Sequence, residues 1–255
     1  MTMRGTSELV LGLLPVVLVL LLWQALISFG YAPPSLLPPP GQVFARMGQQ
    51  LLDTSFQQDI AATLFRLFVG FAIAVVLGVI VGIAAAVSPP VNAAVRPLVR
   101  VLAPLPKVAL YPAMILILGF DDASKIALVA ADAVFPILLA TWQGTSAVDT
   151  KLVWSARAAG CAQQRALFTV VLMAALPSVL TGCRIGLIIS CIVVFLAEMI
   201  TSTDGLGWLL VRAGRNFQTV DMFVPLISIS ILGLTLNAAF NTLRAFLLRG
   251  FPEET

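Results

Sequence analysis

The sequence RLFVGFAIAVVLGVIVGIAAAVSPP, residues 66–90, contains no charged residue after its first position, and none follows until Arg96. An apolar run of about 20 residues forms a helix that crosses the hydrocarbon core of a bilayer. The pattern predicts a membrane-spanning helix over about Ile60–Val87. The Ser88-Pro89-Pro90 sequence should end it, because proline breaks a continuing helix.

The composition of the whole chain agrees with this interpretation. Of its 255 residues, 60% are hydrophobic and 11% are charged, and the mean hydropathy is +1.02, whereas soluble domains carry about 25% charged residues. The chain contains no histidine and three cysteines. This excludes histidine-based triads and zinc sites and leaves no disulfide framework or metal motif. We therefore predict an all-α, multi-pass membrane protein without a metal site.

Six apolar stretches predict six transmembrane helices. The third contains several prolines and a lysine, and helix breakers at membrane depth are tolerated where the backbone lines a cavity or packs in protein. Six spans place both termini on one side. With the N-terminus inside, the inner segments hold more lysine and arginine than the outer ones, which favours both termini in the cytoplasm (N-in/C-in). The predicted spans are Leu9–Phe29, Ile60–Val87, Leu98–Phe120, Ser124–Trp142, Ala175–Met199 and Met222–Leu243.

The segments between the spans differ in character. Tyr31–Gln42 is proline-rich and predicts a linker at the outer membrane surface, followed by a short interfacial helix over Val43–Leu52. The segment Gln143–Arg165 is polar and charged and would face the cytoplasm. Residues 200–221 are predicted to form a polar outer segment.

Small residues recur at every fourth position on two of the predicted spans. Such ridges let helix backbones approach closely, which drives helix association in membranes. We predict that these faces pack against other helices. The ridge residues are Gly70, Ala74, Gly78, Gly82 and Ala86 on the second span, and Gly182, Gly186 and Ser190 on the fifth.

Four ionisable residues lie within or near the spans: Lys107, Asp132, Arg184 and Glu198. A charge in the bilayer is costly and usually faces a cavity or a partner, so all four are candidates for lining a translocation pathway. Arg184 and Glu198 share a stripe opposite the small-residue ridge of their span. The stripe also contains Ile188, Cys191 and Phe195. Glu198 has the alternative of extending to water at the outer end. Asp132 lies mid-span and either pairs with Lys107 or Arg184 or lines a polar cavity.

The sequence LVWSARAAGCAQQRALFTVVLMAALPSVLTGCRIG, residues 152–186, predicts two short helices across the cytoplasmic face, the first ended by Gly160. The stretch resembles the signature E-A-A-x-x-x-G-x9-I-x-L-P of binding-protein-dependent ABC importer permeases. Trp154 stands where that signature has glutamate, which puts a contact specific to the carboxylate in doubt. Met173 stands where the signature has proline. The matching residues are Ser155, Ala156, Gly160, Val170 and Leu172.

The resemblance covers about residues 57–248, including 103–149 and AEMITSTDGLGWLL at 197–210. Within the family, the sequence resembles in particular the aliphatic sulfonate, taurine, nitrate and pyrimidine-precursor branch. It implies a type I importer fold in the bacterial inner membrane with three parts. These are an N-terminal span with its outer linker (1–56), the permease domain (57–248, coupling loop about 144–166) and a cytoplasmic tail (249–255).

The resemblance also implies partners and roles. Two permease subunits would form the pathway, two cytoplasmic ATPases would bind ATP and Mg²⁺, and a periplasmic or lipid-anchored binding protein would deliver a small, anionic or polar solute. The chain has no G-x-x-x-x-G-K-[ST] sequence, so it lacks a P-loop and is expected to be no enzyme. Residues implied in ATPase coupling are Trp154, Ser155, Ala156, Arg157, Gly160 and Arg165; candidates for binding-protein docking are Asp121, Asp204, Arg212 and Arg215.

An ATP-independent secondary transporter or channel is the alternative function. Broken helices and intramembrane charges fit that class as well. The chain shows no clear inverted repeat, however, and the cytoplasmic elbow would then have no purpose. Because the solute is not encoded in any motif, a sulfonate, taurine, nitrate and a pyrimidine-type compound all remain open.

Overall fold

The computed structural model describes residues 3–249 and 251, with side chains described from residue 14 onward. The predicted tail, 249–255, lies largely outside the described residues. All described secondary structure is helical, including a 3₁₀ turn (η1) and a π-helical turn (η2). The elements are α1 (Met3–Ser28), α2 (Pro40–Gln50), α3 (Thr54–Val87), α4 (Pro89–Leu102), η1 (Lys107–Leu110), α5 (Tyr111–Leu118), α6 (Asp122–Ser146), α7 (Thr150–Ala158), α8 (Gln163–Ala166), η2 (Leu167–Val171), α9 (Leu172–Thr201), α10 (Leu206–Arg215) and α11 (Thr219–Leu247).

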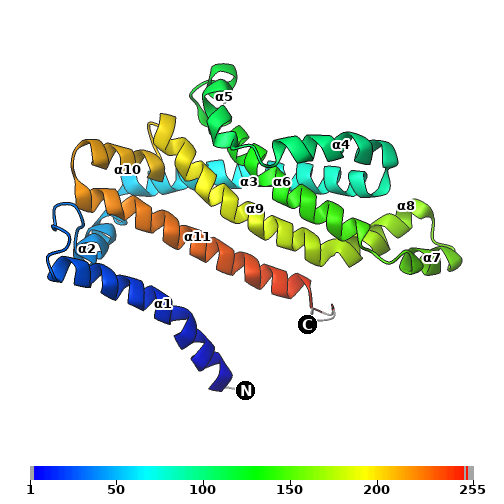
Figure 1. Cartoon of the computed structure of the whole chain (residues 1–255), viewed down its shortest axis with the longest axis horizontal. Helices are drawn as coiled ribbons and strands as arrows, with labels where there is room; N and C mark the ends of the chain where they lie inside the picture. Colours follow the sequence, from blue (N-terminus) through cyan, green and yellow to red (C-terminus); the bar gives the residue numbers. More distant parts are fainter. Residues whose placement is uncertain (1–2, 250, 252–255) are drawn as a thin grey trace.

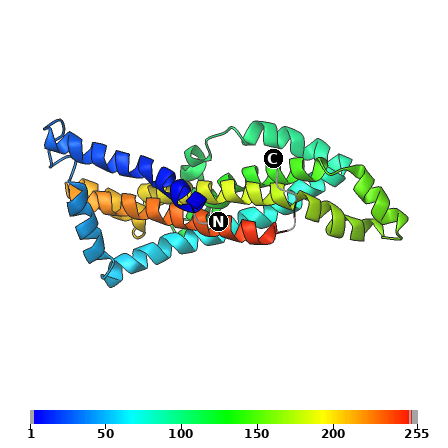
Figure 2. The same cartoon turned by 90° about the horizontal axis from the view of Figure 1, so that it is seen from below.

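The long helices run side by side along the longest axis of the molecule (Figure 1). Helix α6 packs along both α3 and α9, and α11 lies against α9 and α10. Helices α2 and α10 lie at one end of the molecule, whereas α7 and α8 protrude at the other (Figures 1 and 2). Helix α1 begins, and helix α11 ends, on the side of the molecule nearer to α7 and α8 (Figures 1 and 2).

Within the described residues, four helical segments are long and apolar enough to cross a membrane. The helix α4 and the segment η1–α5 meet at an angle of 88° and together qualify as a broken fifth span. The part of α1 with described side chains, Leu14–Ser28, is apolar but shorter. The four long segments are Thr54–Val87, Asp122–Ser146, Gln163–Thr201 and Thr219–Leu247.

The two predicted ridges of small residues both face α6. A Cβ atom added to Gly70, Gly78 or Gly82 would lie 2.7–2.8 Å from α6 side chains, and one added to Gly182 or Gly186 would come equally close. The packing prediction is therefore confirmed, and α6 is held between the ridges of α3 and α9. This close approach brings charged groups from three helices together at the end of the bundle that carries α10.

The helix boundaries near proline differ from the prediction. Helix α3 ends at Val87 as expected, but α4 begins at once at Pro89 rather than near Leu98. The first turn of a helix tolerates proline because its N–H groups have no intrahelical acceptor there. The predicted break in the third stretch is confirmed, since α4 stops at Leu102 before the 88° bend.

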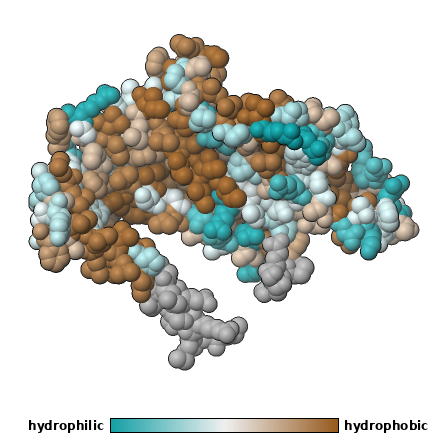
Figure 3. All heavy atoms as spheres, in the orientation of Figure 1, coloured by the Kyte–Doolittle hydropathy of each residue, from teal (hydrophilic) through white to brown (hydrophobic). Residues whose placement is uncertain are grey.

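The segment after α9, for which the sequence predicts only a polar character, contains the ten-residue helix α10. The apolar surface lies over the long helices, while hydrophilic residues gather toward α4, α7 and α8 (Figure 3). This distribution suits a bundle whose middle is surrounded by lipid and whose α7–α8 end lies in water.

Candidate functional site

The elbow formed by α7 and α8 stands clear of the helical bundle (Figure 1). Gly160 has a φ of +86°, and its N–H bonds to the Arg157 carbonyl while the Cys161 N–H bonds to the Ala156 carbonyl. These two bonds form a Schellman motif. The prediction that Gly160 ends the first elbow helix is confirmed.

The elbow presents apolar side chains to its surroundings. Every residue of α7 is exposed or half-buried. The side chains of Leu152 and Trp154 are 50% and 67% exposed, and Ser155, Arg157 and Arg165 are exposed as well. An exposed tryptophan on a protruding helix is typical of a contact with another protein.

A second site lies at the bend between α4 and α5. The Lys107 ammonium is 3.2 Å from the Asp132 carboxylate and donates to the carbonyls of Ala103 (3.2 Å) and Leu105 (3.3 Å). Its Nζ also lies 4.5 Å from the centre of the Phe135 ring, where a cation is attracted by the aromatic face. Of the partners considered for Asp132, the structure selects Lys107.

The remaining basic candidate, Arg184, faces α11. Its Nε donates to the Asn237 side chain at 3.0 Å. Above it, a mainly apolar groove of about 560 Å³ lies between α9 and α11. The groove includes Ile188, Cys191 and Phe195, which belong to the stripe predicted on the fifth span.

Glu198 does not continue that stripe into the groove. It is fully buried, so its carboxylate does not extend to water. It instead accepts from Arg66 at 2.7 Å. Helix α10 folds back over this position and turns the end of the stripe inward.

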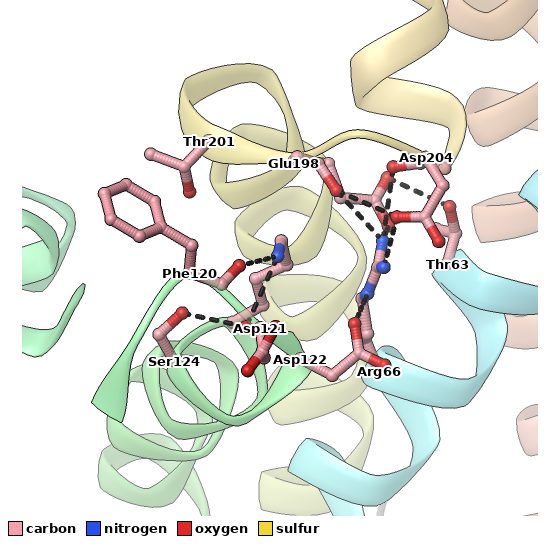
Figure 4. Close-up of polar contacts among 12 residues, drawn as sticks. Thr63, Arg66, Phe120, Asp121, Asp122, Ser124, Glu198, Thr201 and Asp204 are labelled. Atoms are coloured by element: carbon pink, nitrogen blue, oxygen red, sulfur yellow. Dashed lines mark hydrogen bonds and ion pairs between the residues drawn. The ribbon is translucent and has the colours of Figure 1, made fainter.

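Arg66 is the centre of a charged cluster at the end of the bundle that carries α10 (Figure 4). Its side chain is 3% exposed and contacts three carboxylates: Asp122 at 2.6 Å, Glu198 at 2.7 Å and Asp204 at 2.5 Å. It also donates to the Ser202 hydroxyl. The planar guanidinium suits this role, because its five donors are arranged in a fixed fork. The outer cluster, named for the end that the predicted topology places outside, is defined as Arg66 with these three carboxylates. It joins α3, α6, the end of α9 and the turn before α10.

Polar bonds around the outer cluster fix the neighbouring turn. The buried Lys125 donates to the carbonyls of Phe120 and Asp121, and the Tyr111 and Thr201 hydroxyls lie 2.9 Å apart.

Partial burial raises the pKa of the Asp204 carboxyl, but hydrogen bonds from Arg66 and Ser202 outweigh this and hold the pKa below its ordinary value. Asp204 therefore stays ionised at neutral pH.

The four predicted docking residues, Asp121, Asp204, Arg212 and Arg215, are all exposed. Asp204 belongs to the outer cluster, Asp121 directly precedes the cluster residue Asp122, and the two arginines lie in the last turn of α10. Sequence analysis missed Arg66 as a functional candidate, although a basic residue at the start of an apolar run is a signal for a paired charge.

The fold and these features define a membrane transport subunit. A model of the family of binding-protein-dependent transport system inner membrane components matches residues 78–251. The chain is 32% identical over 230 residues to the putative aliphatic sulfonates transport permease protein SsuC of Escherichia coli (strain K12), covering 90% of this chain and 88% of that protein. It is 29% identical over 244 residues to the taurine transport system permease protein TauC of the same strain, covering 94% and 89%.

The fold has solved counterparts. A chain of the MetNI methionine ABC transporter in inward-facing conformations matches with a TM-score of 0.66 at 20% identity, covering 74% of this chain and 94% of that one. The protein belongs to the family of binding-protein-dependent transport system inner membrane components. It is the transmembrane permease subunit of an ABC importer, a multi-pass protein of the bacterial inner membrane and a transport subunit rather than an enzyme. In this family, ATP is used by partner ATPases rather than by the permease.

Proposed function

We propose that two copies of this chain form the pathway of an importer for a small anionic or polar solute. A sulfonate or taurine is favoured by the names of the relatives, and nitrate or a pyrimidine-type compound belongs to the same branch. Each copy would couple to one cytoplasmic ATPase through the elbow and would receive solute from a binding protein at the outer end. The observation that carries the proposal is the exposed elbow in a chain of this family, with Trp154 67% exposed.

The proposed topology has six spans with both termini in the cytoplasm. The start of α1 and the end of α11 are directed toward the elbow (Figure 2). The inner segments carry the larger share of basic residues, in keeping with the positive-inside rule. The bent pair of α4 and η1–α5 then supplies the third span, and α1 supplies the first.

Lys107 and Asp132 are the proposed pathway residues at mid-depth. Asp132 lies ten positions after the start of α6, which is about 15 Å along the helix. Its side chain is 22% exposed. A partly exposed carboxylate is costly against hydrocarbon, so this face is better suited to a wet pathway between two copies. Arg184 is a further candidate, and the burial of Glu198 favours a supporting role for that residue.

No observation favours the secondary-transporter alternative over the importer, because the broken helix and the charges within the bundle fit both classes. A transporter without an ATPase would have no use for a protruding helix that exposes Leu152 and Trp154. The ATPase-coupled function gives both side chains a contact surface.

Native mass spectrometry of the co-expressed complex tests the proposal. We expect two permease chains with two ATPase chains, and Trp154→Ala should reduce the fraction that retains the ATPases. Phe217→Ala removes an aromatic that is 91% exposed at the opposite end and is the matched control. A transport-competent single chain without ATPases would contradict the proposal.

A further inference from the structure

The N-terminus of α10 is capped by side chains from two other helices. The first N–H groups of a helix have no intrahelical acceptor, and the N-cap residue of α10 is Gly205, which has no side chain of its own. The Gly205 N–H donates to Asp59 of α3 (2.7 Å), the Leu206 N–H to Thr63 of α3 (3.0 Å) and the Gly207 N–H to Glu198 of α9 (3.0 Å).

These caps are connected to the outer cluster. The Thr63 hydroxyl donates to Glu198 at 2.9 Å, and Arg66 contacts both the Glu198 carboxylate and the side chain and carbonyl of Asp204. The turn that leads into α10 and the first turn of α10 are therefore held from α3 through one hydrogen-bonded network (Figure 4).

The backbone is shaped for this contact. Gly205 has a φ of +93°, and a Cβ atom there would lie 2.5 Å from the Glu198 carboxylate. Only glycine permits both this conformation and this approach. The last turns of α10 then place Arg212 and Arg215 on the outer surface, where both are exposed.

We propose that Thr63 and Arg66 are positioning residues for binding-protein docking, because they fix the orientation of α10 and its two exposed arginines. This inference rests on the proposed function, in which a binding protein delivers solute at the outer end. Neither residue contacts the partner; each acts through the cap of α10.

Thr63→Val is the most informative test, because it is nearly isosteric, keeps the charge and removes the acceptor of the Leu206 N–H. Thr141→Val is the matched control: Thr141 is also fully buried, and its hydroxyl has no hydrogen-bond partner among the described residues. The measurement is ATP hydrolysis by the complete complex as the purified binding protein is titrated in, with Mg-ATP present. Hydrogen exchange at the amides of residues 205–207 is followed in parallel.

We expect Thr63→Val to raise the half-stimulating concentration of binding protein about tenfold, with basal and maximal hydrolysis unchanged and faster exchange at 205–207. Arg66→Lys, which keeps the charge but loses the fork, should shift the same concentration at least as far, and Thr141→Val should shift neither quantity. Faster exchange with an unchanged half-stimulating concentration would overturn the positioning role, and unchanged exchange would overturn the cap. Absence of stimulation in the unaltered complex would instead contradict the proposed importer function.

Discussion

Arg66 and Lys107 are both buried cations in this bundle, but their surroundings differ. Arg66 contacts three carboxylates drawn from α6, α9 and the turn before α10. Lys107 contacts one carboxylate, two backbone carbonyls and an aromatic face. The first site joins elements that are far apart in the sequence, whereas the second neutralises a charge at a helix break. The difference separates a structural cluster from a pathway candidate, and substitutions test that separation.

The largest loss of stability is expected from Arg66→Met. Without the guanidinium, three carboxylates lie together with no cation between them, and breaking a buried ion pair from one side costs about 3–5 kcal/mol. Arg46→Met is the control, because the Arg46 side chain is 45% exposed in its pair with Asp221 and such pairs contribute about 1 kcal/mol or less. Denaturant or thermal unfolding of the solubilised complex measures both. Equal losses would show that the outer cluster adds no more than a surface pair.

A smaller loss is expected from Gly205→Ala, which tests whether the outer cluster requires close backbone approach. The backbone of Gly205 has φ +93° and ψ 168°, a conformation that costs about 1–3 kcal/mol for a non-glycine residue, and the new methyl group would also displace the Glu198 carboxylate. Gly160→Ala at the elbow is the control, since its φ is also positive but a Cβ there would meet no described atom within 4 Å. We expect unfolding measurements to give the greater loss for Gly205→Ala. The reverse order would contradict the close packing of the outer cluster.

The smallest loss of stability, with the clearest effect on transport, is expected from Asp132→Asn. The oxygen of an asparagine side chain is able to accept a hydrogen bond from the Lys107 ammonium, so the change in stability should be about 1 kcal/mol, while uptake by the reconstituted complex should change. Asp221→Asn, on the surface pair, should alter neither quantity much. Normal uptake with a large loss of stability would make Lys107–Asp132 a structural pair, like the outer cluster. Normal uptake with normal stability would leave Asp132 with no role in either.

The sequence by itself determined the features that depend on local pattern. Apolar run length placed the long helices, the prolines after Leu102 predicted the broken span, and Gly160 predicted the end of the elbow helix. The ridges on α3 and α9 were also readable, because residues four apart share one helix face. Each of these rests on geometry within a single helix or turn.

Only the tertiary structure decided which charges meet. Arg66 lies 56 residues from Asp122 and 132 from Glu198, and no sequence pattern specifies such a contact. The sequence left Asp132 with Lys107 or Arg184 as partners, and the bend before α5 selected Lys107. The spacing of residues along the fifth span places Glu198 on the same helix face as Arg184, because such spacing describes one helix alone. The return of α10 over the end of α9 buries it, since contacts between distant segments depend on how the helices cross and fold back.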